Sequence, residues 1–92
     1  MPQDYVKAAY WLRKAAEQGY AGAQYKLGAM YSLGVGVPQD YVQAAKWFIL
    51  AKASGYDEGG NLLHSTEQVM TSAQIAEAQS LAREWWTKHH KR

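Results

Sequence analysis

Residues 2–20 read PQDYVKAAYWLRKAAEQGY, and residues 38–56 repeat this segment as PQDYVQAAKWFILAKASGY. Eleven of the nineteen aligned residues are identical, and Pro2 aligns with Pro38 at an offset of 36 residues. A fixed offset of this size is typical of proteins built from stacked helical repeats. We therefore expect two copies of one structural unit, with the similarity fading after the second copy.

Composition restricts what the chain can be. It has 92 residues, of which 48% are apolar and 20% charged, a balance typical of one soluble globular domain. The absence of cysteine excludes a disulfide framework, a thiolate metal site and a cysteine nucleophile. No apolar run approaches the roughly 18 residues of a membrane-spanning helix, and the N-terminus lacks the layout of a signal peptide. We expect a soluble protein. Its localisation stays undetermined, since it is either cytoplasmic or exported by a signal that lies upstream.

Apolar side chains recur at helical spacing through most of the chain, which predicts an all-α fold. Gly34, Gly36 and Pro38 are expected to end one helix and turn the chain, because glycine tolerates positive φ and proline cannot continue the hydrogen-bond ladder. Gly59 and Gly60 favour a loop before the next helix. The expected helices are about five and cover residues 4–18, 21–33, 40–54, 61–69 and 71 onward.

Two of these helices have capping signals at their starts. Asp40 with Gln43 forms a DxxQ pattern, and Thr71 with Gln74 forms a TxxQ capping box. Gly55 follows the second copy of the repeated helix, where a left-handed residue is commonly needed. These signals predict helix boundaries near residues 40, 55 and 71.

Several residues occur at the spacing of a known repeat: Ala23, Leu27 with Gly28, Tyr31, the GVGVPQDY segment at 34–41, Ala44, Trp47, Ala51 and Gly55. On these residues, the complete unit at 21–55 resembles a Sel1-like repeat, the α-solenoid unit related to tetratricopeptide repeats. Residues 1–20 resemble the second half of a preceding repeat, so that repeats cover 1–55. Residues 56–92 resemble a degenerate repeat with a C-terminal capping helix. The resemblance implies a right-handed α-α superhelix of about five antiparallel helices, with the first helix of each repeat on the concave side.

The repeated positions also predict how the helices pack. Small residues, mostly alanines, let neighbouring helices approach, and Gly28 serves the paired helix in the same way. We expect Trp11 and Trp47 to fill the space between helices, each burying on the order of 200 Å². Because two consecutive helical positions cannot face one core, Trp85 is expected to be buried and Trp86 exposed.

The resemblance implies a non-catalytic scaffold or adaptor that binds a partner protein or peptide on its concave face. Exposed positions on the first helix of the repeat are mostly small and polar, and no strong charge selects an acidic or basic ligand. The 36-residue offset adds the corresponding positions of the next unit. The expected partner-binding residues are Tyr25, Ala29, Ser32, Asn61, Ser65 and Gln68.

The first helix predicts an alternative function. In a repeat array it would pack against a helix that these 92 residues lack, so its face with Tyr10 and Leu12 needs a cover. That cover is either the rest of a longer natural protein or another molecule. Self-association, as a dimer or end to end, is therefore the alternative to partner binding, with Trp86 as a further possible interface residue.

No pattern indicates catalysis, a cofactor or a metal site. His64, His89 and His90 do not occur in a GxSxG, HExxH or comparable setting. The GxG at 34–36 is expected to be a turn rather than a phosphate loop, because a helix precedes it and Asp40 would repel an anion. The basic segment at 88–92 is expected to be a solvated tail rather than a site for nucleic acid or membrane.

Overall fold

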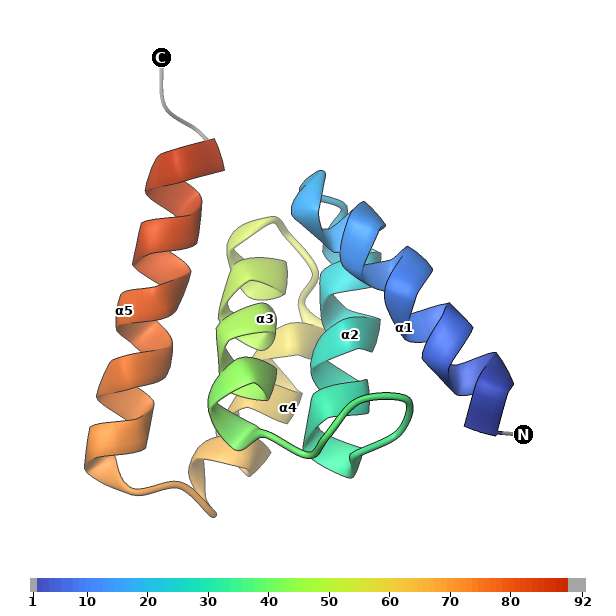
Figure 1. The fold of residues 1–92 in the computed structure, drawn as a ribbon. Coiled ribbons are helices and arrows are strands. Elements are labelled where there is room, and N and C mark those ends of the chain that lie inside the picture. Colours follow the sequence, from blue (N-terminus) through green and yellow to red (C-terminus); the bar gives the residue numbers. More distant parts are fainter. Residues whose placement is uncertain (1, 90–92) are drawn as a thin grey trace.

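The computed structural model describes the chain from residue 2 to residue 89, with side chains from residue 4. Within that range the chain forms five helices and no strand (Figure 1), which confirms the predicted all-α fold. The helices are α1 (Pro2–Glu17), α2 (Ala21–Leu33), α3 (Tyr41–Ala53), α4 (Glu58–Glu67) and α5 (Ser72–His89).

The helices follow the 36-residue repeat. Residues of α1 align with α3, and residues of α2 align with α4. Helix α4 begins at Glu58, so the expectation of a loop at Gly59 and Gly60 is wrong. Packing explains the difference, because a Cβ at residue 59 would lie 3.1 Å from the backbone oxygen of Phe48. Glycine here lets the first turn of α4 lie directly against α3.

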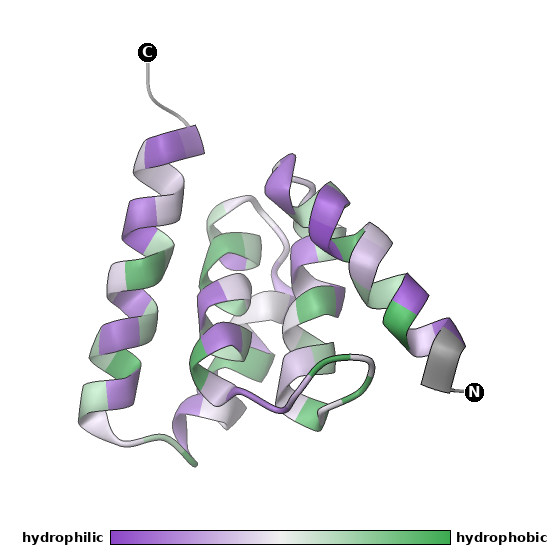
Figure 2. Cartoon of the chain, in the orientation of Figure 1, coloured by the Kyte–Doolittle hydropathy of each residue, from purple (hydrophilic) through white to green (hydrophobic). Residues whose placement is uncertain are grey.

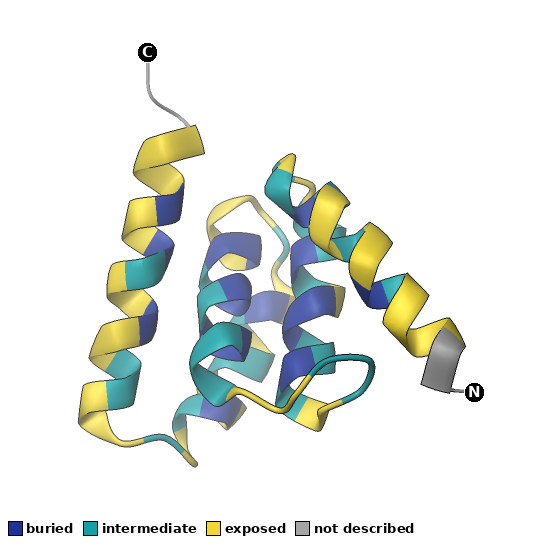
Figure 3. Cartoon of the chain, viewed as in Figure 1, coloured by how far each residue is buried: buried dark blue, intermediate teal, exposed yellow. Residues whose placement is uncertain are grey.

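Helix α3 is the centre of the fold (Figure 1). It packs against α2, α4 and α5, and α2 also packs against α1 and α4. Buried positions are concentrated on α2 and α3, whereas the outer sides of α1 and α5 are exposed (Figure 3). The outer helices α1 and α5 accordingly alternate hydrophilic and hydrophobic residues along their length (Figure 2).

The core is built on α3. Trp47, Phe48 and Leu50 are buried there, together with Leu27 from α2. Gly28 makes the close approach of α2 possible, because a Cβ at this position would lie 2.7 Å from the Phe48 ring. The predicted role of this glycine in helix pairing is therefore confirmed.

The predicted caps are also present. The Asp40 carboxylate accepts a hydrogen bond from the backbone N–H of Gln43 at 3.1 Å. At the start of α5, the Thr71 hydroxyl accepts from the Gln74 N–H at 3.1 Å, and the Gln74 side chain accepts from the Thr71 N–H at 2.9 Å. Gly55 has a φ of 98°, the left-handed conformation expected after α3.

One core prediction is wrong. Trp11 is 64% exposed, whereas its counterpart in the repeat, Trp47, is 0% exposed. Helix α3 is surrounded by α2, α4 and α5. Among residues 2–89, by contrast, α2 is the single helix that packs extensively on α1. The same tryptophan therefore lies in a covered position in one unit and an open position in the other.

Polar contacts connect α1 to the rest of the fold. The buried side-chain amide of Gln24 on α2 donates to the backbone oxygen of Ala16 at 3.1 Å. The indole N–H of Trp85 on α5 donates to the Glu17 carboxylate at 2.9 Å. Trp85 is buried and Trp86 is 37% exposed, as predicted from their adjacent positions.

We expect Gly28→Ala to lower the free energy of unfolding by about 1–2 kcal/mol, because the added methyl group overlaps the Phe48 ring. Gly22→Ala is the matched control in the same helix, where the nearest atom to an added Cβ is a Tyr56 ring carbon at 3.9 Å. This control should be neutral or more stable by up to about 1 kcal/mol, since alanine favours helix. Urea unfolding would measure both, and equal stability of the two variants would contradict the packing argument.

We also expect Trp85 and Glu17 to be energetically coupled. A double-mutant cycle of Trp85→Phe and Glu17→Ala should give a coupling energy of about 1 kcal/mol, because Trp85→Phe removes the donor of this hydrogen bond and Glu17→Ala removes its acceptor. Urea unfolding of the four proteins gives this energy. Strict additivity would mean that the hydrogen bond does not stabilise the attachment of α5 to α1.

Candidate functional site

An apolar hollow of about 420 Å³ lies between α1 and α2. We call it the α1/α2 hollow, and Lys26 is the one residue with a charged side chain among those that line it. Helix α1 contributes one wall, α2 contributes the other, and the turn after α2 closes one end. The lining residues are Tyr5, Ala8, Leu12, Tyr25, Lys26, Ala29, Met30, Leu33 and Val35.

Two of the expected partner-binding residues, Tyr25 and Ala29, line the α1/α2 hollow. The Tyr25 ring is fixed by ring contacts with Phe48 at 6.0 Å and with Tyr56 at 4.7 Å between centroids. Hydrogen bonding to the Glu58 carboxylate raises the pKa of Tyr56. The Tyr25 ring is therefore held in place by its aromatic neighbours.

The other expected residues lie elsewhere. Ser32 is half-buried on α2 and its hydroxyl donates to the Ala29 backbone oxygen at 2.9 Å, so it is not part of the hollow's lining. The side chains of Asn61 and Ser65 on α4, and of Gln68 directly after it, are exposed. Two of the six residues thus lie at the α1/α2 hollow and three on α4 or just after it, whereas Ser32 belongs to neither group. Helix α2, which carries the first group, packs against α4.

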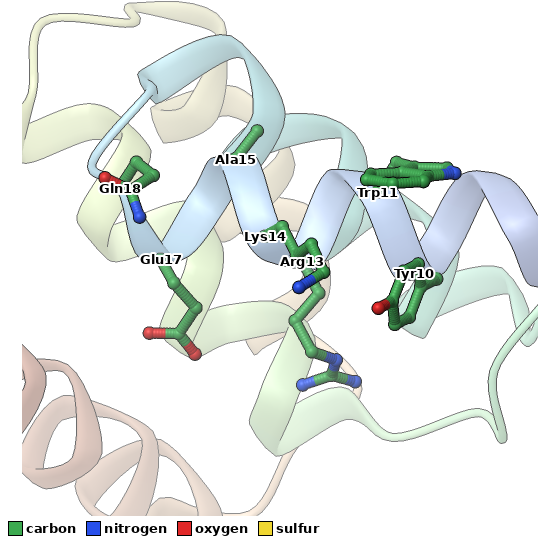
Figure 4. A pocket seen from close by; sticks show the side chains of 7 residues that line it. All are labelled: Tyr10, Trp11, Arg13, Lys14, Ala15, Glu17 and Gln18. Atoms are coloured by element: carbon green, nitrogen blue, oxygen red, sulfur yellow. The ribbon is translucent and has the colours of Figure 1, made fainter.

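Exposed aromatic side chains mark the outer side of α1. Tyr10 is 55% exposed and Trp11 is 64% exposed, and their rings meet edge to face at 5.1 Å (Figure 4). We call these two residues the aromatic face of α1. They border a hollow of about 560 Å³ along with Arg13 and Glu17. Leu12, expected beside Tyr10 at an interface, instead turns towards the core and the α1/α2 hollow.

A third hollow, of about 320 Å³, lies between α3 and α5. Trp86 lines it together with Ile49, Leu50 and Ala53. The indole of Trp86 therefore covers an apolar edge of the α3/α5 contact, which accounts for its partial exposure. The interface expected at Trp86 stays a prediction.

Three ionisable side chains in the described range contact neighbouring side chains. His64 contacts the Gln68 side-chain amide at 3.0 Å, and His89 stacks on Trp85 at 3.9 Å. Burial lowers the pKa of Lys46, whose ammonium lies 4.4 Å from the centre of the Trp47 ring. Within residues 2–89 no three His, Cys, Asp or Glu side chains are grouped as metal ligands would be. The predicted basic tail continues through residues 90–92, which lie outside the described residues.

No helix in the described part of the chain combines the length and apolarity needed to cross a membrane. Sequence reasoning missed six residues of the hollow: Tyr5, Ala8, Lys26, Met30, Leu33 and Val35. The 36-residue offset contained the signal, because it aligns Ala8 with Ala44, which is fully buried, and so marks a position that should be covered.

Comparisons with known proteins agree with this fold. The family described as Sel1 repeat matches residues 1–20 and 21–56. The crystal structure of a protective antigen present in uropathogenic Escherichia coli strains, described as displaying an SLR fold, is similar with a TM-score of 0.87 and 40% sequence identity. That alignment covers 92% of this chain and 18% of the antigen chain, so the present chain spans a small part of its length. No protein with a curated description matches the chain. The family match, the repeated helix pairs and the similar fold together show that the chain belongs to the Sel1 repeat family.

Proposed function

We propose that this chain is a non-catalytic interaction module that binds a partner polypeptide on the side formed by α2 and α4. Sel1 repeats generally mediate protein–protein interactions, and their fold is typically a non-catalytic scaffold. The observation that carries the proposal is the α1/α2 hollow, an apolar surface that the chain's own side chains leave open. Exposed apolar surface of this kind commonly marks an interaction site in a small soluble domain.

The two parts of the surface offer different chemistry. Tyr25 and Ala29 present a rigid aromatic ring and space beside it, which suits an apolar side chain of the partner. Asn61 and Ser65 on α4, and Gln68 directly after it, present exposed hydrogen-bonding groups. A polypeptide that places an apolar anchor in the hollow and runs along α4 would use both, with polar contacts fixing its register.

A pull-down with the 92-residue chain tests this proposal. Ser65→Arg should abolish recovery of the partner that the unchanged chain captures, because it places a long cation on the exposed side of α4 without disturbing the core. Ala76→Arg introduces the same side chain at an exposed position of α5 and is the matched control. Retention of the partner by Ser65→Arg, with the same yield as the control, would contradict binding on this side.

Self-association is a second candidate, favoured by the exposure of Tyr10 and Trp11 on the aromatic face of α1. In that case light scattering at high micromolar concentration should give the mass of a dimer or higher assembly. The variant Trp11→Glu should return the mass of a monomer, because it places a charge in the apolar interface. A monomer for the unchanged chain under the same conditions would exclude obligate self-association.

A further inference from the structure

The last turns of α1 and α5 lie at the same end of the fold (Figure 1) and meet through side chains. Backbone packing between these two helices is slight, because α1 packs mainly on α2 and α5 packs mainly on α3. Three side chains make the contact: Glu17 from α1, and Trp85 and His89 from α5. We call them the Glu17 contact. Within residues 2–89, the attachment of α5 to α1 therefore depends mainly on these three residues.

The imidazole of His89 is held in one orientation. Its Nδ1 atom lies 2.8 Å from the backbone oxygen of Trp85, one turn earlier in α5. A carbonyl oxygen only accepts hydrogen bonds, so Nδ1 must carry a proton. The ring also stacks on the Trp85 indole, with the centroids 3.9 Å apart and the planes inclined by 10°. These two interactions direct the other ring nitrogen, Nε2, at Glu17.

The position of Nε2 makes the contact depend on the charge of the ring. Nε2 lies 3.4 Å from Oε1 of Glu17, the same atom that accepts the indole N–H of Trp85 at 2.9 Å. In a neutral imidazole with its proton on Nδ1, Nε2 presents a lone pair, which repels a carboxylate oxygen. In a charged imidazole Nε2 also carries a proton and can pair with the carboxylate. The geometry therefore fits the charged ring and disfavours the neutral one.

The surroundings act on the ring in both directions. A positive charge is favoured over the face of an indole, and it is also favoured at the C-terminal end of a helix, where His89 lies. The cations near Glu17 oppose it, and these are Arg13 on α1, Lys46 on α3 and Lys88 on α5. Among these side-chain types, imidazole is the one that ordinarily changes its charge between about pH 5 and 8.

We propose that the Glu17 contact is a pH-dependent attachment of α5 to α1, formed when His89 is charged and broken when it is neutral. The stabilisation is present where imidazole is charged and is lost as the pH rises through the range in which imidazole gives up its proton. Breaking the contact exposes the indole of Trp85, which is 6% exposed when the contact is formed. This inference goes beyond the proposed function, since it concerns α1 and α5 and needs no partner.

A double-mutant cycle at two pH values tests the proposal. The starting protein is the 92-residue chain with His64→Gln and His90→Gln, which leaves His89 as its one histidine. Urea unfolding of this protein, of Glu17→Gln, of His89→Gln and of the combined variant is measured at about pH 5.5 and about pH 8. Glutamine at residue 17 removes the charge but keeps an oxygen that can accept the Trp85 indole N–H.

We expect the coupling between residues 17 and 89 to change the folding equilibrium constant about two- to fivefold at the lower pH, the size usual for an exposed ion pair. At the higher pH the coupling should vanish. Other groups that titrate in this range affect all four proteins alike, so they cancel in the cycle. Equal coupling at both pH values, or no coupling at either, would overturn the proposal.

Tryptophan emission of the folded chain gives a second measurement. In the starting protein the emission maximum should move to longer wavelength at the higher pH, as Trp85 becomes exposed to water. His89→Gln should show the longer wavelength at both pH values. Lys46→Gln removes the half-buried amine that lies over the Trp47 ring, and it should retain the pH-dependent shift.

The emission measurement can also contradict the proposal. A shift that persists in His89→Gln, or that disappears in Lys46→Gln, would assign the titration to a group other than His89. An unchanged emission maximum in the starting protein would mean that α5 stays attached when the imidazole is neutral. Circular dichroism at both pH values verifies that each variant is folded.

Discussion

The contact between the Phe48 ring and the backbone of α2 at Gly28 sets the geometry on which the other helices depend. The ring occupies the space that any side chain at residue 28 would need, so α2 and α3 can pair closely only with glycine there. Helices α4 and α5 both pack on the same α3. The rings of Trp47 on α3 and Trp85 on α5 meet edge to face, with their centroids 6.1 Å apart. The indole N–H of Trp85 also donates a hydrogen bond to the Glu17 carboxylate on α1. One close helix pair thereby positions elements from both ends of the chain.

Features set by local sequence or by the repeat itself could be predicted. The caps at Asp40 and Thr71 depend on residues three positions apart, and burial of Trp47 follows from its place in a complete unit. The start of α4 could not be predicted in this way. From the sequence alone Gly59 is expected to lie in a loop. Only its contact with the α3 backbone shows that it serves helix packing. Glycine has both uses, and the neighbouring element decides between them.

The candidate site was predicted in part, for a related reason. Tyr25 and Ala29 were identified from their positions on the first helix of the repeat, and both lie in the α1/α2 hollow. Met30 and Val35 were missed because a hollow is defined by the elements on both of its sides, and a pattern within one helix does not report the distance to the next. The 36-residue offset also aligns Ser32 with Gln68, and sequence analysis predicts a partner-binding role for both. In the structure Ser32 is half-buried and Gln68 is exposed.

Trp11 and Trp47 show most clearly that a motif does not determine burial. Both follow the same AA step in matching segments, yet one is exposed and the other is enclosed. Burial of a large aromatic side chain is worth about 1.5–3 kcal/mol, which Trp47 contributes to folding of this chain. The corresponding free energy at Trp11 is not gained on folding of these residues, because its side chain stays exposed. The same residue type thus stabilises the fold at one position of the repeat and does not do so at the other.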